Sequence, residues 1–303
     1  MIPPVRPRLT LSAQPDFDLV HRYSAWLERN GKAEATIEAY HADVADLVRA
    51  FAPRRPAELM PHDVRTYLAG RSQAEQWAPA TVRRHLQAIK SFYRYLVGEE
   101  RLRAPGPAER LAEPVVKPDA PLILSEAEVA VLFGYLESAA RGPAATMERM
   151  DLALYGLCYF AALLVSEAVG LTVDAVRGWP TALHLTVVGR GGTRSHVTLD
   201  GDPAQWLSTW IAERPHPFIR AMEPFVFIHP RSHVHTSRQR AWHRLRQVAR
   251  TAGLGEEMVG RLGPHTLRHS YAAHLAARAA GVGALREALR QRSPRHAAKY
   301  ITA

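Results

Sequence analysis

The sequence predicts a mainly α-helical protein of two domains, in which the C-terminal domain is α+β and contains a small antiparallel sheet. Three observations favour this fold class. Four amphipathic helical patterns fill the first hundred residues. A proline-rich stretch with little apolar periodicity then runs from Arg103 to Pro121. Beyond it, helical patterns flank one pair of alternating segments joined by a glycine-rich turn. A chain of 303 residues is long enough for two such domains.

The N-terminal domain is expected to span residues 1–103 and to consist of four helices. Apolar side chains recur at helical spacing in residues 17–29, 34–51, 61–68 and 79–96. The third and fourth patterns begin with a proline, which fits the first turn of a helix. The polar face of the fourth helix is basic and carries Arg83, Arg84, His85, Lys90 and Arg94. Such a face is either simply solvated or binds an anionic partner.

The proline-rich residues 104–121 are interpreted as a semi-rigid linker. The C-terminal domain is expected at residues 122–303, and its first helix begins where Ser125 and Glu128 have the spacing of a capping box. A strongly apolar helix is predicted over residues 150–168, and a β-hairpin with its turn at Gly189–Gly192. Further helices are predicted near residues 204–211, 237–252, 266–279 and 283–290.

The net charge of +10 and the isoelectric point near 10.1 favour a polyanionic partner. The positive excess lies in both predicted domains. Residues 1–117 contain 18 Lys and Arg against 14 Asp and Glu, and residues 118–303 contain 21 against 15. Because neutralised phosphates supply most nucleic-acid affinity, this distribution suits a protein that contacts double-stranded DNA with both domains.

Several classes of protein do not fit the sequence. The longest apolar stretch, from Leu152 to Val165, has 14 residues, whereas a membrane span needs about 20. The single cysteine, Cys158, excludes an internal disulfide and a multi-cysteine metal site. The first residues lack the pattern of a secretory signal. We therefore expect a cytoplasmic protein without a membrane segment, a metal site or a cofactor.

The most informative segment runs from Gly263 to Leu275. His265 lies at the start of a predicted helix and Arg268 one turn later, so both project to the same side. A capping histidine and a surface arginine would give the same spacing. The whole segment, followed 32 residues after Arg268 by Tyr300, resembles the second motif box of the tyrosine recombinases, the phage integrase and Xer-like family.

The resemblance covers nearly the whole chain. Residues 35–40 and 79–86 resemble parts of the family's helical core-binding (SAM-like) domain. Residues 122–129 resemble the usual opening of its catalytic domain, and Gly189–Gly191 resembles the hairpin turn of that domain. The motifs occur in the family's order and spacing, which is more specific than any one of them.

The resemblance implies a transesterification at a DNA phosphodiester. A tyrosine oxygen attacks the scissile phosphorus, leaving a 3′-phosphotyrosyl bond and a free 5′-hydroxyl, and a later attack by a 5′-hydroxyl reverses the step. By this resemblance Tyr300 is the nucleophile, Arg268 binds the phosphate, and His265 is a hydrogen-bond donor or base. The site must stabilise negative charge on the non-bridging oxygens and supply a base and an acid.

Three positions differ from the family pattern. Leu164 occupies the place of the other phosphate-binding arginine, and a leucine offers neither charge nor donors. Arg190 replaces the hairpin lysine that is thought to act as the acid, and arginine is a poor proton donor. Gln291 occupies the second His or Trp position, where it can donate to a phosphate oxygen without charge. These differences lead us to expect impaired cleavage, with Arg190 and Gln291 kept as candidate catalytic residues.

The remaining candidate residues bind DNA in this interpretation. They are basic or polar side chains on three predicted helices, and most are expected to contact phosphates. The first helical domain supplies Thr36, Arg83, Arg84, Lys90 and Arg94, and the helix near Ser237 supplies Arg238, Arg240, Arg244 and Arg246. Self-association on DNA, as a dimer or tetramer, or pairing with a partner recombinase is expected.

Two alternatives remain open at the level of the sequence. The first is a family member that has lost strand cleavage and acts as an accessory or regulatory DNA-binding protein. The second is an unrelated helical transcription regulator, which would not need the hairpin or the series His265, Arg268 and Tyr300. A small-molecule enzyme fits less well, since no phosphate-binding glycine loop or nucleophile elbow is present in the sequence.

Overall fold

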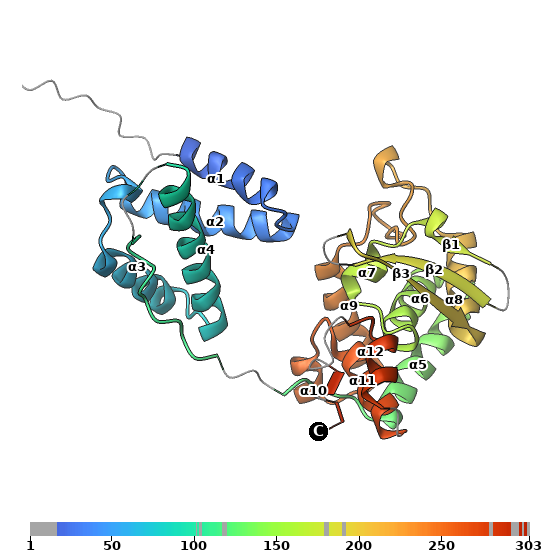
Figure 1. Ribbon diagram of the computed structural model, residues 1–303. Helices are drawn as coiled ribbons and strands as arrows, with labels where there is room; N and C mark the ends of the chain where they lie inside the picture. Colours follow the sequence, from blue (N-terminus) through green and yellow to red (C-terminus); the bar gives the residue numbers. More distant parts are fainter. Residues whose placement is uncertain are drawn as a thin grey trace, which may run out of the picture. The chain divides into compact units, whose positions relative to one another are not determined.

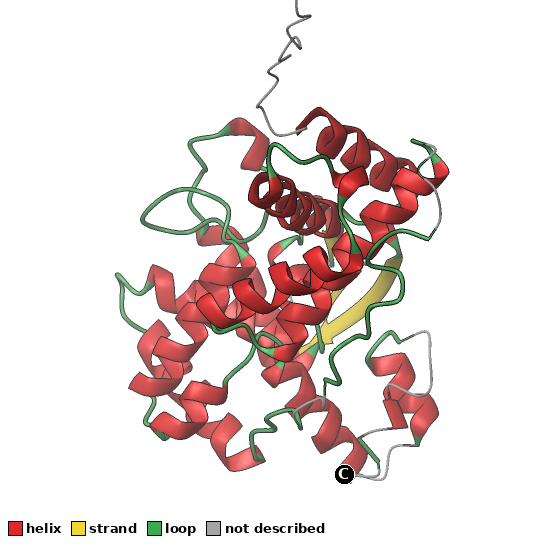
Figure 2. Cartoon of the chain, turned by 90° about the vertical axis from the view of Figure 1, so that its left-hand side faces the viewer, coloured by secondary structure: helices red, strands yellow, loops and turns green. Residues whose placement is uncertain are grey.

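The computed structural model describes residues 17–100, 102, 105–116, 120–178, 182–189, 192–278, 281–291, 297–298 and 300–301. The chain divides into two compact units, Met1–Pro118 and Asp119–Ala303 (Figure 1). The division falls inside the stretch that the sequence predicts as a linker. Helices make up most of both units, and the strands of the described residues form a small sheet (Figure 2).

The described residues of the first unit form four α-helices and one short 3₁₀ helix. The α-helices are α1 (Phe17–Arg29), α2 (Glu34–Phe51), α3 (Pro61–Ala74) and α4 (Pro79–Gly98), and the 3₁₀ helix is η1 (Pro56–Glu58). The predicted apolar faces pack together around Tyr23 and Phe92, both fully buried. Helix α3 extends six residues past its predicted end, and Arg71 in this extension forms ion pairs with Asp46 at 2.9 Å and Glu75 at 2.8 Å.

Part of the proline-rich stretch packs on the first unit. Ala108 is fully buried in the core of that unit, and Leu102 and Leu111 pack against the same core. A Cβ atom at Gly106 would lie only 2.7 Å from Cβ of Tyr93, so the backbone approaches that ring closely. Residues 105–111, which the sequence analysis includes in a semi-rigid linker, thus pack on the first unit through their few apolar side chains.

The second unit is built around the central helix α6 (Thr146–Phe160). The residues of α6 from Met150 to Tyr159 are buried on every side, as expected for a helix surrounded by other elements. Helix α6 contacts α5 (Glu126–Ala140), α7 (Val165–Val169), α8 (Gly201–Glu213) and α11 (Thr266–Ala277). The other helices are α9 (Arg238–Thr251), α10 (Glu256–Arg261), α12 (Val282–Ala288), η2 (Val173–Ala175) and η4 (Arg220–Met222).

The sheet of the second unit is antiparallel in the order β1–β2–β3. Its strands are β1 (Val176–Arg177), β2 (Ala182–Val188) and β3 (Arg194–Asp200). Strand β2 buries Leu183, Leu185 and Val187, and Leu183 pairs with the buried Leu199. The predicted hairpin is present. Strand β1 and helix α10 are too short to give a periodic pattern and are not predicted from the sequence.

The long apolar helix expected at residues 150–168 is broken. Helix α6 ends at Phe160, and Ala162 has a left-handed backbone with φ of 47°. Helix α7 begins after Leu164, whose backbone N–H donates to Oε2 of Glu167 at 2.9 Å. The prediction fails because the apolar residues continue through the break, so hydrophobicity alone does not mark it. As a result, the carbonyls of residues 161 and 162 are free of helical hydrogen bonds at this point.

No described helix is both long and apolar enough to cross a membrane.

Candidate functional site

Tyr300 lies against helix α11 in the second unit. Its hydroxyl forms a hydrogen bond with Nδ1 of His269, and the two ring centroids are 5.8 Å apart. His269 directly follows Arg268 in α11, so the C-terminal turn of the described chain meets the motif segment of the sequence.

The phenol of Tyr300 is held in its protonated form. Only 7% of the residue is exposed, and its ring packs with Ala162, Ala272 and Leu289. Burial raises the pKa of Tyr300, while the positive charge of Arg268 acts in the opposite direction. Nδ1 of His269 can accept the proton of this hydroxyl when the nitrogen is unprotonated.

Arg268 is a buried cation held by backbone carbonyls. It is 8% exposed, and Nη1 donates to the carbonyl oxygen of Ala162 at 2.6 Å while Nη2 donates to that of Leu289. Its Nη1 also lies 3.7 Å from Oε2 of Glu167. Burial lowers the pKa of Arg268, and the neighbouring charge of Arg290 lowers it further.

Arg290 belongs to the same cluster, although the sequence analysis did not select it. Nη1 of Arg290 donates to the carbonyl oxygen of Ala161 at 2.9 Å, and Nη2 donates to that of Ala162 at 2.8 Å. Nη2 also forms an ion pair with Oε2 of Glu167 at 2.9 Å. The backbone of Arg290 is left-handed, with φ of 50°. No motif draws attention to this residue, because its contacts depend on the break after α6.

The other predicted catalytic residues have different outcomes. His265 is the exposed N-terminal flanking residue of α11, with its ring centroid 6.2 Å from that of His269. Gln291 follows Arg290, and its buried Oε1 has no hydrogen-bond partner among the described residues. Arg190 lies outside the described residues. The structure thus brings Tyr300 together with Arg268 and with His269, a histidine that the sequence analysis did not assign.

Leu164 lies beside this cluster rather than in the main core. Its side chain is partly exposed, and it is absent from the large hydrophobic core to which Leu157, Ala161 and Ala168 belong. Its backbone N–H bonds the same Glu167 oxygen that accepts from Arg290. Among the described residues, no group of three or more His, Cys, Asp or Glu side chains is arranged to hold a metal ion.

Some candidate DNA-binding residues of the first unit are exposed, and others form ion pairs within the unit. Arg83 and Arg94 are exposed on α4, and Thr36 is partly buried in the first turn of α2. Arg84 forms an ion pair with Asp43 at 2.9 Å, and Lys90 lies 3.6 Å from Glu113. Asp43 is only 4% exposed, and burial raises its pKa to about 6, so Arg84 stabilises a buried carboxyl group.

Helix α9 likewise carries both paired and exposed arginines. Arg244 donates from Nε to the fully buried Asp151 at 2.7 Å, and Nε of Arg246 donates to the carbonyl oxygen of Val259 at 3.0 Å. These two arginines hold the unit together. Arg238 and Arg240 are exposed at the start of α9, and Arg240 and Arg244 line a pocket of about 410 Å³.

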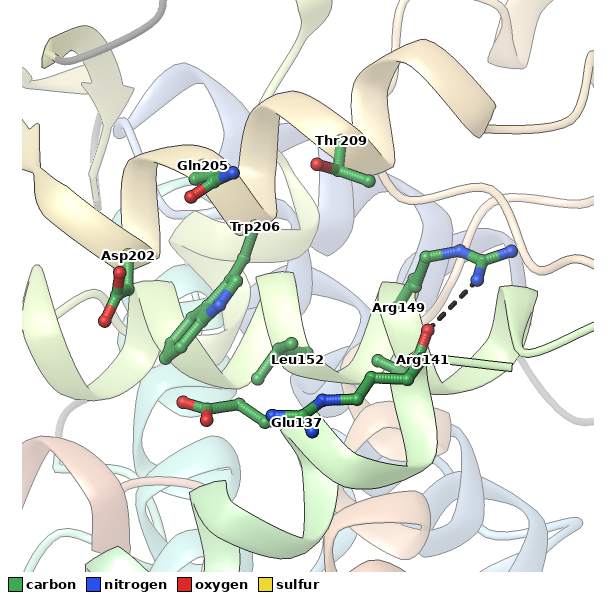
Figure 3. A pocket seen from close by; sticks show the side chains of 9 residues that line it. Glu137, Arg141, Arg149, Leu152, Asp202, Gln205, Trp206 and Thr209 are labelled. Carbon is green, nitrogen blue, oxygen red and sulfur yellow. Dashed lines mark hydrogen bonds between the residues drawn. The ribbon is translucent and has the colours of Figure 1, made fainter. Parts of the chain in front are cut away.

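A second pocket of about 490 Å³ lies among α5, α6 and α8, away from the predicted site residues (Figure 3). Its lining mixes both charges, including Glu137, Arg141 and Asp202 around Trp206. Arg149 at its edge donates to the carbonyl oxygen of Ala140 at 3.0 Å, a bond drawn in Figure 3. This pocket contains none of the predicted site residues.

Comparisons with known proteins agree with the resemblance seen in the sequence. Residues 19–101 match the phage integrase N-terminal SAM-like domain, and residues 123–303 match the phage integrase family. The chain is 32% identical to tyrosine recombinase XerD of Yersinia pestis, over 86% of this chain and 85% of that protein. It is 35% identical to tyrosine recombinase XerC of Erythrobacter litoralis (strain HTCC2594), over 65% of this chain and 60% of that protein.

Solved structures share the fold. The recombinase XerH bound to its difH substrate in a post-cleavage complex matches with a TM-score of 0.68 and 16% identity, over 97% of this chain and 88% of that chain. A lambda integrase dimer bound to a COC′ core site matches with a TM-score of 0.67 and 13% identity, over 94% of each chain. With family matches over both units and a 32% identical relative over most of its length, the chain belongs to the phage integrase family of tyrosine recombinases.

Proposed function

We propose that this protein is a site-specific tyrosine recombinase that binds double-stranded DNA and breaks and rejoins its strands through Tyr300. The observation that carries the proposal is the contact between the Tyr300 hydroxyl and Nδ1 of His269, beside the buried Arg268. A tyrosine that merely filled the core would not require a histidine at its hydroxyl and a guanidinium close by. The similar proteins XerD and XerC are both named tyrosine recombinases.

In the cleavage step, the Tyr300 oxygen forms a bond to the scissile phosphorus as the bond from phosphorus to the 5′-oxygen breaks. The phenolic proton passes to Nδ1 of His269. The departing 5′-oxygen takes up a proton and leaves as a hydroxyl, and the phosphorus remains attached to Tyr300 at the 3′ end. Rejoining reverses these steps with a 5′-hydroxyl as nucleophile, so one phosphoester replaces another throughout.

The positive groups of the cluster stabilise the phosphate. Arg268 uses two of its terminal N–H groups on carbonyls of Ala162 and Leu289, which fixes the plane of its guanidinium. Its charge lies where the transition state gains negative charge. Gln291 and Arg190 are further donors in this proposal, and His265 on the same side of α11 contacts the DNA or the phosphate.

DNA binding in this proposal uses exposed cations of both units. Arg83 and Arg94 on α4, with Arg238 and Arg240 on α9, contact phosphates. The structural relatives that were solved on DNA include a dimer on a core site, and we propose that this chain also assembles with further copies on its target. A cytoplasmic location, where chromosomal and plasmid DNA lie, follows from this role.

The test is covalent trapping on a nicked duplex from which the cleaved end dissociates, so that the adduct cannot be resealed. Wild-type protein is expected to form a covalent protein–DNA adduct that survives denaturing electrophoresis. Tyr300→Phe keeps the ring and removes only the oxygen, so it is expected to form none. If wild type binds the duplex specifically but forms no adduct, the protein is instead an accessory DNA-binding member of the family.

A further inference from the structure

Two arginines share their partners at the end of α6. The carbonyl oxygen of Ala162 accepts from Nη1 of Arg268 at 2.6 Å and from Nη2 of Arg290 at 2.8 Å. The carboxylate of Glu167 lies 3.7 Å from Arg268 and 2.9 Å from Arg290. The two guanidinium groups therefore share one hydrogen-bond acceptor, the carbonyl oxygen of Ala162, and one ion-pair partner, the carboxylate of Glu167.

The backbone is strained at both ends of this contact. Ala162 has φ of 47° and Arg290 has φ of 50°, and side-chain-bearing residues rarely adopt this conformation. Such a backbone persists only when its surroundings enforce it. Glycine would relieve the strain at position 290, yet the chain has an arginine there. The contacts of the Arg290 side chain must therefore stabilise the fold or the site by more than those of an ordinary surface arginine.

The charges of the cluster do not balance. Arg268 and Arg290 face the single carboxylate of Glu167, and the side chains of Arg290 and Glu167 are 12% and 11% exposed. Nε of Arg290 is buried and has no hydrogen-bond partner among the described residues. Burying two cations with one anion is costly unless a further anion binds. The arrangement therefore favours a negatively charged ligand next to Arg268.

We propose that Arg290 is a positioning residue for the scissile phosphate: it fixes the guanidinium of Arg268 and adds the second positive charge that Leu164 does not supply. Its terminal N–H groups are used on carbonyls and Glu167, so it acts through Arg268 and through its charge rather than as a second free clamp. This inference rests on the proposed cleavage by Tyr300 and names how that site binds its substrate.

The test compares adduct formation on two nicked duplexes. One has an ordinary scissile phosphodiester, and the other has a methyl group in place of one non-bridging oxygen, which makes the linkage uncharged. Four proteins are used: wild type, Arg290→Gln, Arg290→Lys and Arg286→Gln. Arg286 is exposed on helix α12, which ends shortly before Arg290, and provides the matched loss of one charge.

On the phosphodiester, Arg290→Gln is expected to form adduct about 100-fold more slowly, a loss typical of one charge-stabilising group. Arg290→Lys is expected to retain part of the rate, and Arg286→Gln all of it. On the uncharged linkage, Arg290→Gln and wild type are expected to react at similar rates, because less negative charge needs stabilising. An equal loss on both linkages would show a purely structural role and overturn the proposal, as would no loss on either.

A binding measurement decides the proposal if wild type forms no adduct, an outcome that refutes only the cleavage function. Inorganic phosphate is expected to raise the thermal unfolding midpoint of wild type and of Arg286→Gln relative to chloride at equal ionic strength. Arg290→Gln is expected to lose this difference. The same phosphate-dependent shift in Arg290→Gln and wild type would overturn the role of Arg290.

Discussion

The hydroxyl of Tyr300 is hydrogen-bonded to Nδ1 of His269, one residue after Arg268 in α11. This contact joins the last described turn of the chain to the helix that carries the buried arginine. In the proposed cleavage, Nδ1 of His269 accepts the proton that the Tyr300 oxygen loses before it attacks phosphorus. His265, one helical turn earlier, is exposed, and its ring centroid lies 6.2 Å from that of His269.

Replacing His269 by Asn should slow covalent adduct formation more than replacing His265 by Asn. A positioned general base contributes about 10²–10⁴-fold, and His269 is hydrogen-bonded to the Tyr300 hydroxyl. The measurement is the single-turnover rate of adduct formation on a nicked duplex at saturating DNA. A larger loss in His265→Asn than in His269→Asn would mean that the histidine of the motif, rather than its neighbour, takes the proton.

Most of the fold could be predicted from the sequence because long periodic patterns of apolar residues mark its helices and strands. The four helices of the first unit, the capping box at Ser125 and Glu128, and the hairpin around residues 189–192 follow local rules, and the structure contains each of them. The break after Phe160 was not accessible, because the apolar run continues through it. Whether a helix ends there depends on contacts with Glu167 and Arg290, which are distant or unmarked in the sequence.

The candidate site could be predicted only in part for the same reason. Tyr300 and Arg268 follow from the motif series, and the structure places them in one cluster. Arg290 could not be selected, since its contacts depend on a left-handed backbone and on the carbonyls of Ala161 and Ala162, which are free of helical hydrogen bonds. Ion pairs to Asp43 and Asp151 likewise show that Arg84 and Arg244 serve the fold, although sequence alone makes them resemble their exposed neighbours.

We expect that the second positive charge beside Arg268 can be supplied from either position 164 or position 290. Leu164→Arg alone adds a third arginine beside one carboxylate, so we expect no faster adduct formation than wild type. Arg290→Gly removes the charge and relieves the left-handed backbone, and the double variant Leu164→Arg/Arg290→Gly should recover a large part of the lost rate. The rates are compared in the same trapping reaction. A strong gain from Leu164→Arg in the presence of Arg290 would contradict this relationship.

Arg244→Ala should destabilise the second unit rather than selectively weaken DNA binding. It leaves the fully buried carboxylate of Asp151 without its 2.7 Å partner, a change that costs about 3–5 kcal/mol in other buried pairs. Urea unfolding measures this loss. Arg238→Ala, at the exposed start of α9, is the matched variant and should alter stability by no more than about 0.5 kcal/mol. Equal stability of the two variants would show that the ion pair between Arg244 and Asp151 does not stabilise the second unit.

Arg83→Ala should reduce the salt dependence of DNA binding. Loss of one phosphate contact lowers the slope of log affinity against log salt by about 1 and weakens binding to all sequences alike. Arg84→Ala is the informative comparison, since Arg84 is bound to the buried Asp43 and its removal should lower the stability of the first unit. An unchanged slope and affinity in Arg83→Ala would exclude this face of α4 from the interface.

The most direct measurement is the identity of the amino acid bonded to DNA. Adduct formed on a nicked duplex is digested with protease, and the peptide that retains the nucleotide is identified by its mass and fragmentation. The nucleotide should be on Tyr300, attached through a 3′-phosphate. A nucleotide on any other side chain, or DNA-bound protein that never becomes covalently linked, would contradict the role given to this tyrosine.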